Sequence, residues 1–192
     1  MRKRTPHAAA RRPTRPALTR TALTQTAAAR IAAALAVALA LSWSPAAHAA
    51  CTDPAAPSVN WRRCFLDGRD FAGADLTGAM LREATFSRSV MKDARLREVD
   101  AYRAKFLSAR LPGADLSGAR LIEADLTRAD LSAAILAGAD LRNAKLVGTD
   151  LRRANLSGAR LEGADLRNAE LGGATWIDGK RVCAEGSVGQ CG

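Results

Sequence analysis

The chain has few of the residues on which most enzyme active sites depend. Both of its histidines, His7 and His48, lie within the first 49 residues, so the remainder has no histidine to act as a general base or metal ligand. Its glycines follow a five-residue spacing and form no phosphate-binding loop. The aspartates also recur at repeat positions, so neighbouring carboxylates do not by themselves indicate catalysis. The sequence therefore predicts a protein that is not an enzyme and that holds no metal or cofactor.

An apolar run long enough to span a membrane is also lacking. The apolar run at 31–41 has eleven residues, whereas a transmembrane helix needs about 20. A basic segment with eight Lys and Arg and no acid precedes this apolar run, and the sequence Ala47-His48-Ala49 follows the run. This order is typical of a secretory signal peptide. We expect a signal peptide at 1–49 and an exported protein, periplasmic or secreted, with a permanent N-terminal anchor as the alternative.

The export route stays open at this point. Arg11-Arg12 resembles a twin-arginine signal, but Pro13-Thr14 stands where that motif has apolar residues. Cys51 is a candidate for lipidation, although His48 occupies the position where such sites usually have Leu. General secretion and a start codon further into the chain are equally compatible with the leader.

The formal net charge of +10 arises mainly from this leader. Eight of the 29 Lys and Arg residues lie within 1–49, which leaves 21 basic against 19 acidic residues and a net charge of +2. The predicted mature protein is therefore close to neutral.

A five-residue repeat dominates the rest of the chain. Every fifth residue from Leu66 to Trp176 is large and apolar except Ala101, which makes 22 of 23 positions. The position two residues before each of these is Ala in 18 of the 23 units. The exceptions in this second series are Cys64, Arg69, Ser89, Val99 and Thr149.

A period of five matches neither a helix, at about 100° per residue, nor a straight strand with its alternating faces. It predicts a coil with one side per unit, in which the large and the small position both point inward. Four sides place residues 20 apart in one column, where Asp100, Arg120, Asp140 and Arg160 alternate in charge. Three sides would place Asp100 over Asp115 and Arg95 over Arg110, and opposed like charges are destabilising. The charges therefore favour four sides.

Units such as Ala114-Asp115-Leu116-Ser117-Gly118 resemble the A(D/N)LXX signature of the pentapeptide-repeat family. The resemblance covers 64–176 and implies an all-β, right-handed quadrilateral β-helix of about six coils. The family's roles are diverse, so the resemblance says little about function. Some members mimic duplex DNA and protect DNA gyrase from quinolones, but such mimicry needs a strongly acidic surface and access to the cytoplasm.

All four cysteines lie at the ends of the repeat. About six coils at roughly 4.8 Å each make a rod near 28 Å long, whereas a disulfide needs Cα atoms within about 7 Å. The pairs are therefore expected to be Cys51–Cys64 and Cys183–Cys191, with a free Cys64 thiol as the alternative. We expect an N-terminal cap at 50–65, the β-helix at 66–176 and a C-terminal cap at 177–192. Trp176, the last residue of the predicted β-helix, is expected to cover the end of the core along the coil axis. Covered ends favour a monomer.

One segment, 82–110, departs from the regular repeat and is rich in basic residues. Val99 and Ala101 exchange the small and large positions there, and Tyr102 is the only tyrosine in the chain. We expect a candidate interaction patch for an anionic partner at Arg95, Arg97, Tyr102 and Arg103. The main functional hypothesis is an exported structural or binding module, whose partner is an unknown protein or anionic envelope component and not a nucleic acid. The alternative is a DNA mimic that interacts with gyrase.

Overall fold

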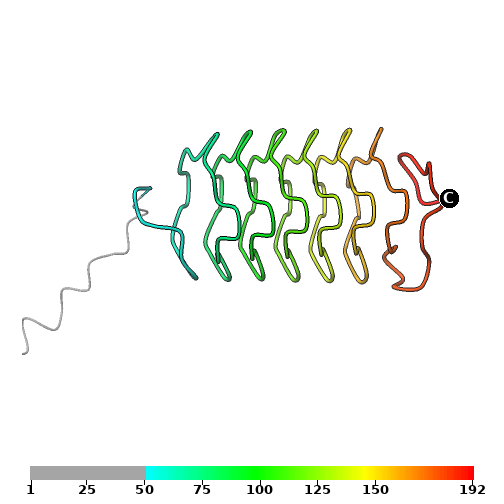
Figure 1. Cartoon of the computed structure of the whole chain (residues 1–192), viewed down its shortest axis with the longest axis horizontal. Coiled ribbons are helices and arrows are strands. Elements are labelled where there is room, and N and C mark those ends of the chain that lie inside the picture. The colour runs from blue at the N-terminus through cyan, green and yellow to red at the C-terminus, as the bar shows by residue number, and fades with distance from the viewer. Residues whose placement is uncertain (1–50) are drawn as a thin grey trace, which may run out of the picture. The chain divides into compact units, whose positions relative to one another are not determined.

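The computed structural model describes residues 51–192, which form a continuous stack of coils (Figure 1). The predicted signal peptide lies outside the described residues, as does Ala50 at the start of the predicted N-terminal cap. Within 51–192 there is neither an α-helix nor a strand of two or more residues, because the regular structure consists of single β-bridges separated by turns. That part of the chain accordingly holds no helix long and apolar enough to cross a membrane.

The bridges recur every five residues from Asn60 to Thr175. Each bridging residue from Asn60 to Asn155 pairs in parallel with the residue 20 positions later, so that Asp100 pairs with Met80 on one side and Arg120 on the other. One coil therefore contains 20 residues and has four sides, as the alternating charges predict. A repeat of 15 residues is ruled out.

The four sides are named here by the outward bridging residue in one coil. They are the Asp100 side, the Lys105 side, the Arg110 side and the Asp115 side, and each side includes the bridges 20 residues before and after. The two-residue turns between them are the Tyr102, Leu107, Pro112 and Ser117 corners, which follow those sides in the same order.

Nearly every corner is closed by a backbone hydrogen bond and contains a left-handed residue. In the Tyr102 corner of the next coil, the N–H of Ala124 donates to the carbonyl of Leu121 at 3.0 Å, and Glu123 has a φ of 57°. Glycine adopts such a φ most readily, yet Arg103 and Glu123 also adopt it here. The ladder fixes this conformation, because the N–H of Glu123 donates to the carbonyl of Arg142 in the next coil at 3.0 Å.

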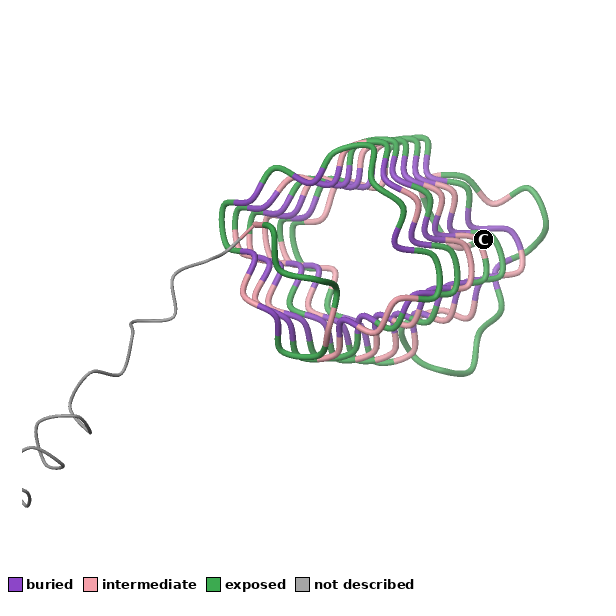
Figure 2. Ribbon diagram, turned by 60° about the vertical axis from the view of Figure 1, so that its left-hand side comes forward, coloured by how far each residue is buried: buried purple, intermediate pink, exposed green. Residues whose placement is uncertain are grey.

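The two inward series form the core. Figure 2 shows that buried positions recur at corresponding places in successive coils. Leu141 is 0% exposed, and the exchanged pair Val99 and Ala101 is also buried. The two hydroxyl residues in the small position are buried with a partner each. Ser89 donates to the carbonyl of Phe86 at 2.8 Å, and Thr149 donates to the carbonyl of Leu126 at 2.8 Å. These bonds explain why polar residues are tolerated inside, since a buried hydroxyl needs a partner.

The ends of the stack differ from its middle. Arg69 occupies a small position of the repeat but is exposed, because it lies in the first full coil and has no coil before it. Trp61 is buried at the same end and contacts Phe71, with ring centroids 5.3 Å apart. The Cys51–Cys64 disulfide joins the preceding segment to this coil. An aromatic cluster therefore fills the core at the N-terminal end.

At the other end the chain turns back on the last coil. Val182 forms an antiparallel bridge with Thr175, and Val188 forms one with Glu170. The Cys183–Cys191 disulfide closes the loop that contains Val188. This segment covers only the Asp115 and Arg110 sides. The Asp100 and Lys105 sides stay uncovered at this end. Leu161 and Leu166 on these two sides are therefore half-buried, although they follow the inward pattern. Trp176 is also half-buried and packs against the core.

Candidate interaction surfaces

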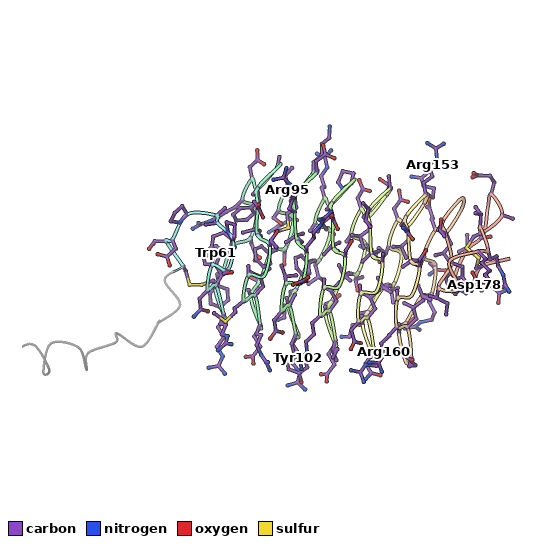
Figure 3. All side chains as sticks on the ribbon, turned by 90° about the horizontal axis from the view of Figure 1, so that it is seen from below. Trp61, Arg95, Tyr102, Arg153, Arg160 and Asp178 are labelled. Atoms are coloured by element: carbon purple, nitrogen blue, oxygen red, sulfur yellow. A yellow bond between two sulfur atoms is a disulfide. The ribbon has the colours of Figure 1, made fainter. Side chains whose placement is uncertain are left out.

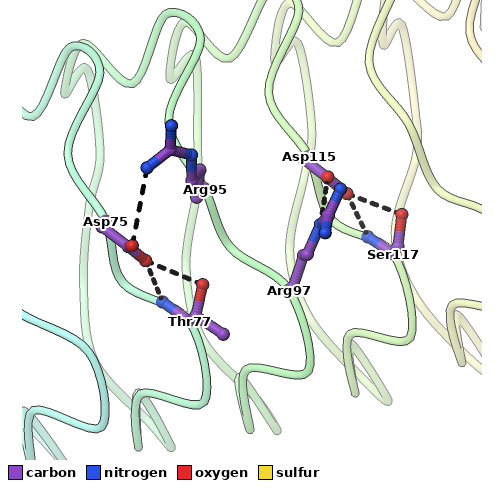
Figure 4. A network of polar contacts seen from close by, with 6 residues as sticks. All are labelled: Asp75, Thr77, Arg95, Arg97, Asp115 and Ser117. Carbon is purple, nitrogen blue, oxygen red and sulfur yellow. Dashed lines mark hydrogen bonds and ion pairs between the residues drawn. The ribbon is translucent and has the colours of Figure 1, made fainter.

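The first two members of the predicted patch lie on the Asp115 side and the Ser117 corner. Arg95 forms an ion pair with Asp75 of the preceding coil at 3.6 Å. Arg97 forms an ion pair with Asp115 of the following coil. Figure 4 shows both pairs together with the turn residues Thr77 and Ser117, which donate to the same carboxylates. Each of these two arginines is therefore already neutralised by an acid.

The carboxylates in these pairs are held in the charged form. Hydrogen bonds from the Thr77 hydroxyl and N–H, together with Arg95, keep the pKa of Asp75 below its ordinary value. Burial raises the pKa of Asp115, but hydrogen bonds from Ser117 and Arg97 outweigh it and leave that pKa lowered. Both ion pairs are accordingly present at neutral pH.

The other two members, Tyr102 and Arg103, lie on the Tyr102 corner in a mixed network. Arg103 bonds Glu123 at 2.7 Å, and the Tyr102 hydroxyl lies 3.3 Å from the same carboxylate. The guanidinium groups of Arg82 and Arg103 each lie 4.9 Å from the centre of the Tyr102 ring. The hydrogen bond and the charge of Arg103 lower the pKa of Glu123. Tyr102 therefore contacts side chains of three successive coils at this corner, namely Arg82, Arg103 and Glu123.

The four predicted residues do not form one continuous surface. The Asp100 side separates the Ser117 corner from the Tyr102 corner, and Figure 3 shows Arg95 and Tyr102 on opposite edges of the stack. All three arginines have carboxylate partners. Their role in binding stays a prediction.

A different group of basic residues has no such partners. Among the described residues, Arg88, Lys105, Arg128 and Lys145 form no ion pair, and all four are exposed. They lie on the Lys105 side and the Leu107 corner, and we call them the unpaired basic row. Sequence reasoning missed this row because the four residues are spread over 58 positions of an otherwise regular repeat. The 20-residue period, applied to basic residues alone, would have found it.

For Lys105, the residue in the preceding coil explains the missing ion pair. Arg95, Arg120 and Arg160 bridge to an aspartate of the preceding coil and pair with it at 3.6–3.7 Å. Lys105 instead follows Thr85 in its column, so it has no acid there.

Lys145 lies between two acids, Asp125 and Asp165, but forms no ion pair among residues 51–192. Asp125 accepts a hydrogen bond from the N–H of Thr127 at 3.1 Å. Asp165 is bound by Arg167 through two nitrogens, at 2.9 and 2.6 Å, and this contact lowers its pKa.

One groove occurs near the C-terminal segment. It has a volume of about 370 Å³ and lies where Glu185 meets the Pro112 corner. Arg153 and Gly172 line it together with Ser132, Ala133 and Arg152. Gly172 leaves little room for a side chain, because a Cβ there would lie 3.0 Å from a Glu185 oxygen and 3.4 Å from the N–H nitrogen of Gly186.

No metal centre or reactive thiol is evident in the described part. Residues 51–192 contain no group of three or more His, Cys, Asp or Glu side chains that could hold a metal ion. Each of their four cysteines is in a disulfide.

The family model for pentapeptide repeats matches the chain in eight copies, over 59–88, 70–106, 102–137 and 134–173. These matches span more than half of the sequence. The chain therefore belongs to the pentapeptide-repeat family, whose members fold as quadrilateral β-helices and are in general structural or binding proteins. No curated protein matches it.

Several solved structures are similar to the chain. A pentapeptide repeat protein from the Arabidopsis thaliana thylakoid lumen is 25% identical over 67% of this chain and 84% of that chain, with a TM-score of 0.39. The protein Rfr23 from the cyanobacterium Cyanothece 51142 is 24% identical over 61% of this chain and 90% of that chain, with a TM-score of 0.38.

QnrB1, a plasmid-mediated fluoroquinolone resistance protein, is 22% identical over 62% of this chain and 63% of that chain, with a TM-score of 0.35. The present chain thus spans less than two thirds of the QnrB1 chain. Because all three TM-scores are below 0.5, we draw no functional conclusion from these likenesses.

Proposed function

We propose that the protein is an exported, non-enzymatic binding module. The observation that carries this proposal is the pairing of all four described cysteines in two disulfides, one at each end of the repeat. Disulfides persist in oxidising compartments and are rare in the cytoplasm. The basic and apolar leader at 1–49 and its Ala47-His48-Ala49 sequence support the same compartment.

The form we propose is a rod of about six coils with a cap at each end. The segment before Cys64 caps the N-terminal coil, and residues 177–192 cap the C-terminal coil. An uncapped β-helix would present unpaired backbone groups that invite edge-to-edge association. The antiparallel bridges of Val182 and Val188 support the C-terminal cap, and they favour a monomer.

The surface available for binding consists of the outward positions of each coil. These residues vary from coil to coil while the inward positions remain nearly constant, so the scaffold holds a flat face on which recognition residues can change. An anionic partner of the cell envelope fits the basic residues that lie on this surface. The candidate patch of Arg95, Arg97, Tyr102 and Arg103 and the unpaired basic row are two locations for it.

The gyrase-interacting alternative is disfavoured by charge. A mimic of duplex DNA has to present many negative charges, whereas residues 50–192 carry 21 basic and 19 acidic residues. Such a protein would also have to remain in the cytoplasm, where the two disulfides would not be expected.

Cell fractionation followed by peptide mapping without reductant tests the proposal. We expect the protein in the periplasm or medium, with an N-terminus at Ala50 or Cys51 and with Cys51–Cys64 and Cys183–Cys191 peptides. Full-length cytoplasmic protein with four titratable thiols would refute export and would revive the gyrase alternative.

A further inference from the structure

We propose that the unpaired basic row binds a linear, phosphate-bearing polyanion that lies along the axis of the coil stack. This inference rests on the proposed function only in treating the protein as a binding module. It does not depend on where the protein is located in the cell.

The charge of this surface differs from that of the rest of the protein. The charge on this face is counted over the stretches 85–88, 105–108, 125–128 and 145–148. These stretches contain the four cations of the row and a single acid, Asp125. Their local net charge is therefore +3, although residues 50–192 as a whole carry only +2. The remainder of that segment has a net charge of −1, so a polyanion is attracted to this face and repelled weakly elsewhere.

The unpaired basic row follows the axis of the stack. Successive coils are about 4.8 Å apart, and each of four successive coils contributes one cation in the order Arg88, Lys105, Arg128, Lys145. Binding a single small anion would require these cations to converge, but they lie in four successive coils and alternate between the Leu107 corner and the Lys105 side. A polymer that presents an anionic group to each coil matches this spacing.

Two features together separate these cations from those of the other faces, namely the lack of an ion pair and the small number of acids beside them. Arg110 also forms no ion pair among the described residues, but its side of the stack carries Asp70, Asp130, Asp150 and Glu170. An arginine already bonded to a carboxylate has to lose that bond before it binds another anion. The four residues of the row have no ion pair to break among residues 51–192. Guanidinium and ammonium groups both bind phosphate oxygens through charge-assisted hydrogen bonds, and the row offers two of each.

A membrane surface is the competing partner for a basic face. Interfacial binding requires a broad apolar surface beside the cations. Only two large apolar residues on this face within the described part are exposed, Phe65 at 80% and Leu107 at 36%. They lie two coils apart in different columns, so a polymer is the better match.

Lysine footprinting on the full-length protein tests the proposal directly. The purified protein is acetylated with and without long-chain inorganic polyphosphate, and the modification of each lysine is measured by peptide mass spectrometry. The chain provides its own control, since Lys92 and Lys180 are also exposed and form no ion pair among the described residues, but they lie off the row. The basic leader does not affect the comparison, because each lysine is read separately.

We expect polyphosphate to lower acetylation of Lys105 and Lys145 several-fold and to leave Lys92 and Lys180 unchanged. Orthophosphate at the same phosphate concentration should protect none of them. Equal protection of all four lysines, or none, would overturn the proposal, as would protection of the row only by vesicles of anionic lipid. Fractionation tests export in a separate experiment, so failure of one result is distinguishable from failure of the other.

Discussion

Truncation of Leu141 to Ala tests the inward frame at a fully buried position. Leu141 is 0% exposed and stands in one column between Leu121 and Leu161. The substitution removes three carbon atoms, which at about 0.8 kcal/mol per buried CH₂ corresponds to about 2.4 kcal/mol of lost transfer free energy. The cavity left behind adds to this loss, and measured Leu→Ala changes in protein cores fall at about 2–5 kcal/mol.

Leu161→Ala provides a matched control in the same column. Leu161 occupies the equivalent position in the last coil but is half-buried, because no residue of a further coil covers it. The cavity opens to solvent there, and less apolar surface is lost from the core. We therefore expect Leu161→Ala to cost less than half as much as Leu141→Ala.

Equilibrium unfolding in guanidinium chloride, with the disulfides intact, measures both changes, and thermal unfolding gives a second measure. A loss of about 3 kcal/mol should lower the Tm by about 6–12 °C for a domain of this size. Equal destabilisation by the two substitutions, or no change for Leu141→Ala, would show that the inward assignment is wrong.

Three further predictions concern the corners, the acids and the ends. Gly172→Ala should loosen the C-terminal segment and increase hydrogen exchange there, because the new Cβ would lie 3.0 Å from a Glu185 oxygen. Gly192→Ala is the control and should have no effect, since its Cβ would meet only Ser187, at 3.7 Å. The hydrogen bond from Arg142 lowers the pKa of Asp140, so this acid stabilises the fold above its ordinary pKa and the contribution is lost as the pH falls through the lowered pKa. The free energy of unfolding of Asp140→Asn should accordingly vary less between pH 5 and pH 2 than that of the wild type, and identical curves would contradict this. Replacing Cys51 with Ser and Cys64 with Ala should cost about 2–3 kcal/mol for a loop of this length, and unchanged urea unfolding would contradict it.

The sequence was sufficient to predict the coil because each inward position has one chemical requirement repeated many times. Large apolar and small residues alternate in a frame that does not shift, and only a coil of 20 residues places the charges of the Asp100 side in alternation. The pairing of the cysteines followed from the length of that coil. The exposure of Arg69 could not be predicted from the repeat. An inward position no longer requires a small residue where no coil precedes it.

The ion pairs could be predicted only in part. Columns such as Asp100, Arg120, Asp140 and Arg160 were expected from the period, and the structure contains the Arg120–Asp100 and Arg160–Asp140 pairs. The Arg110 side instead stacks Asp130, Asp150 and Glu170, which the alternation does not predict. Arg152 relieves this repulsion by contacting both Asp150 and Glu170. Such a contact depends on the direction of a corner side chain, which the repeat does not determine.

Two triple variants with the same loss of charge give the most direct test of which cations bind the polyanion. One variant lacks cations that form no ion pair, and the other lacks arginines that are paired with a carboxylate. One replaces Arg88, Lys105 and Arg128 with Ser, which the Leu107 corner accepts because Ser108 already adopts a φ of 53° there. The other replaces Arg95, Arg97 and Arg103 with Ser.

Affinity for long-chain polyphosphate is measured for both variants and the wild type over a range of salt concentrations. We expect the first variant to lose at least about tenfold in affinity and to show a salt slope smaller by about 2–3, since each lost phosphate contact reduces the slope by about 1. The second variant should bind as the wild type does. Equal weakening by both would show that net charge alone governs binding, and loss only in the second would place the site at Arg95, Arg97 and Arg103 instead.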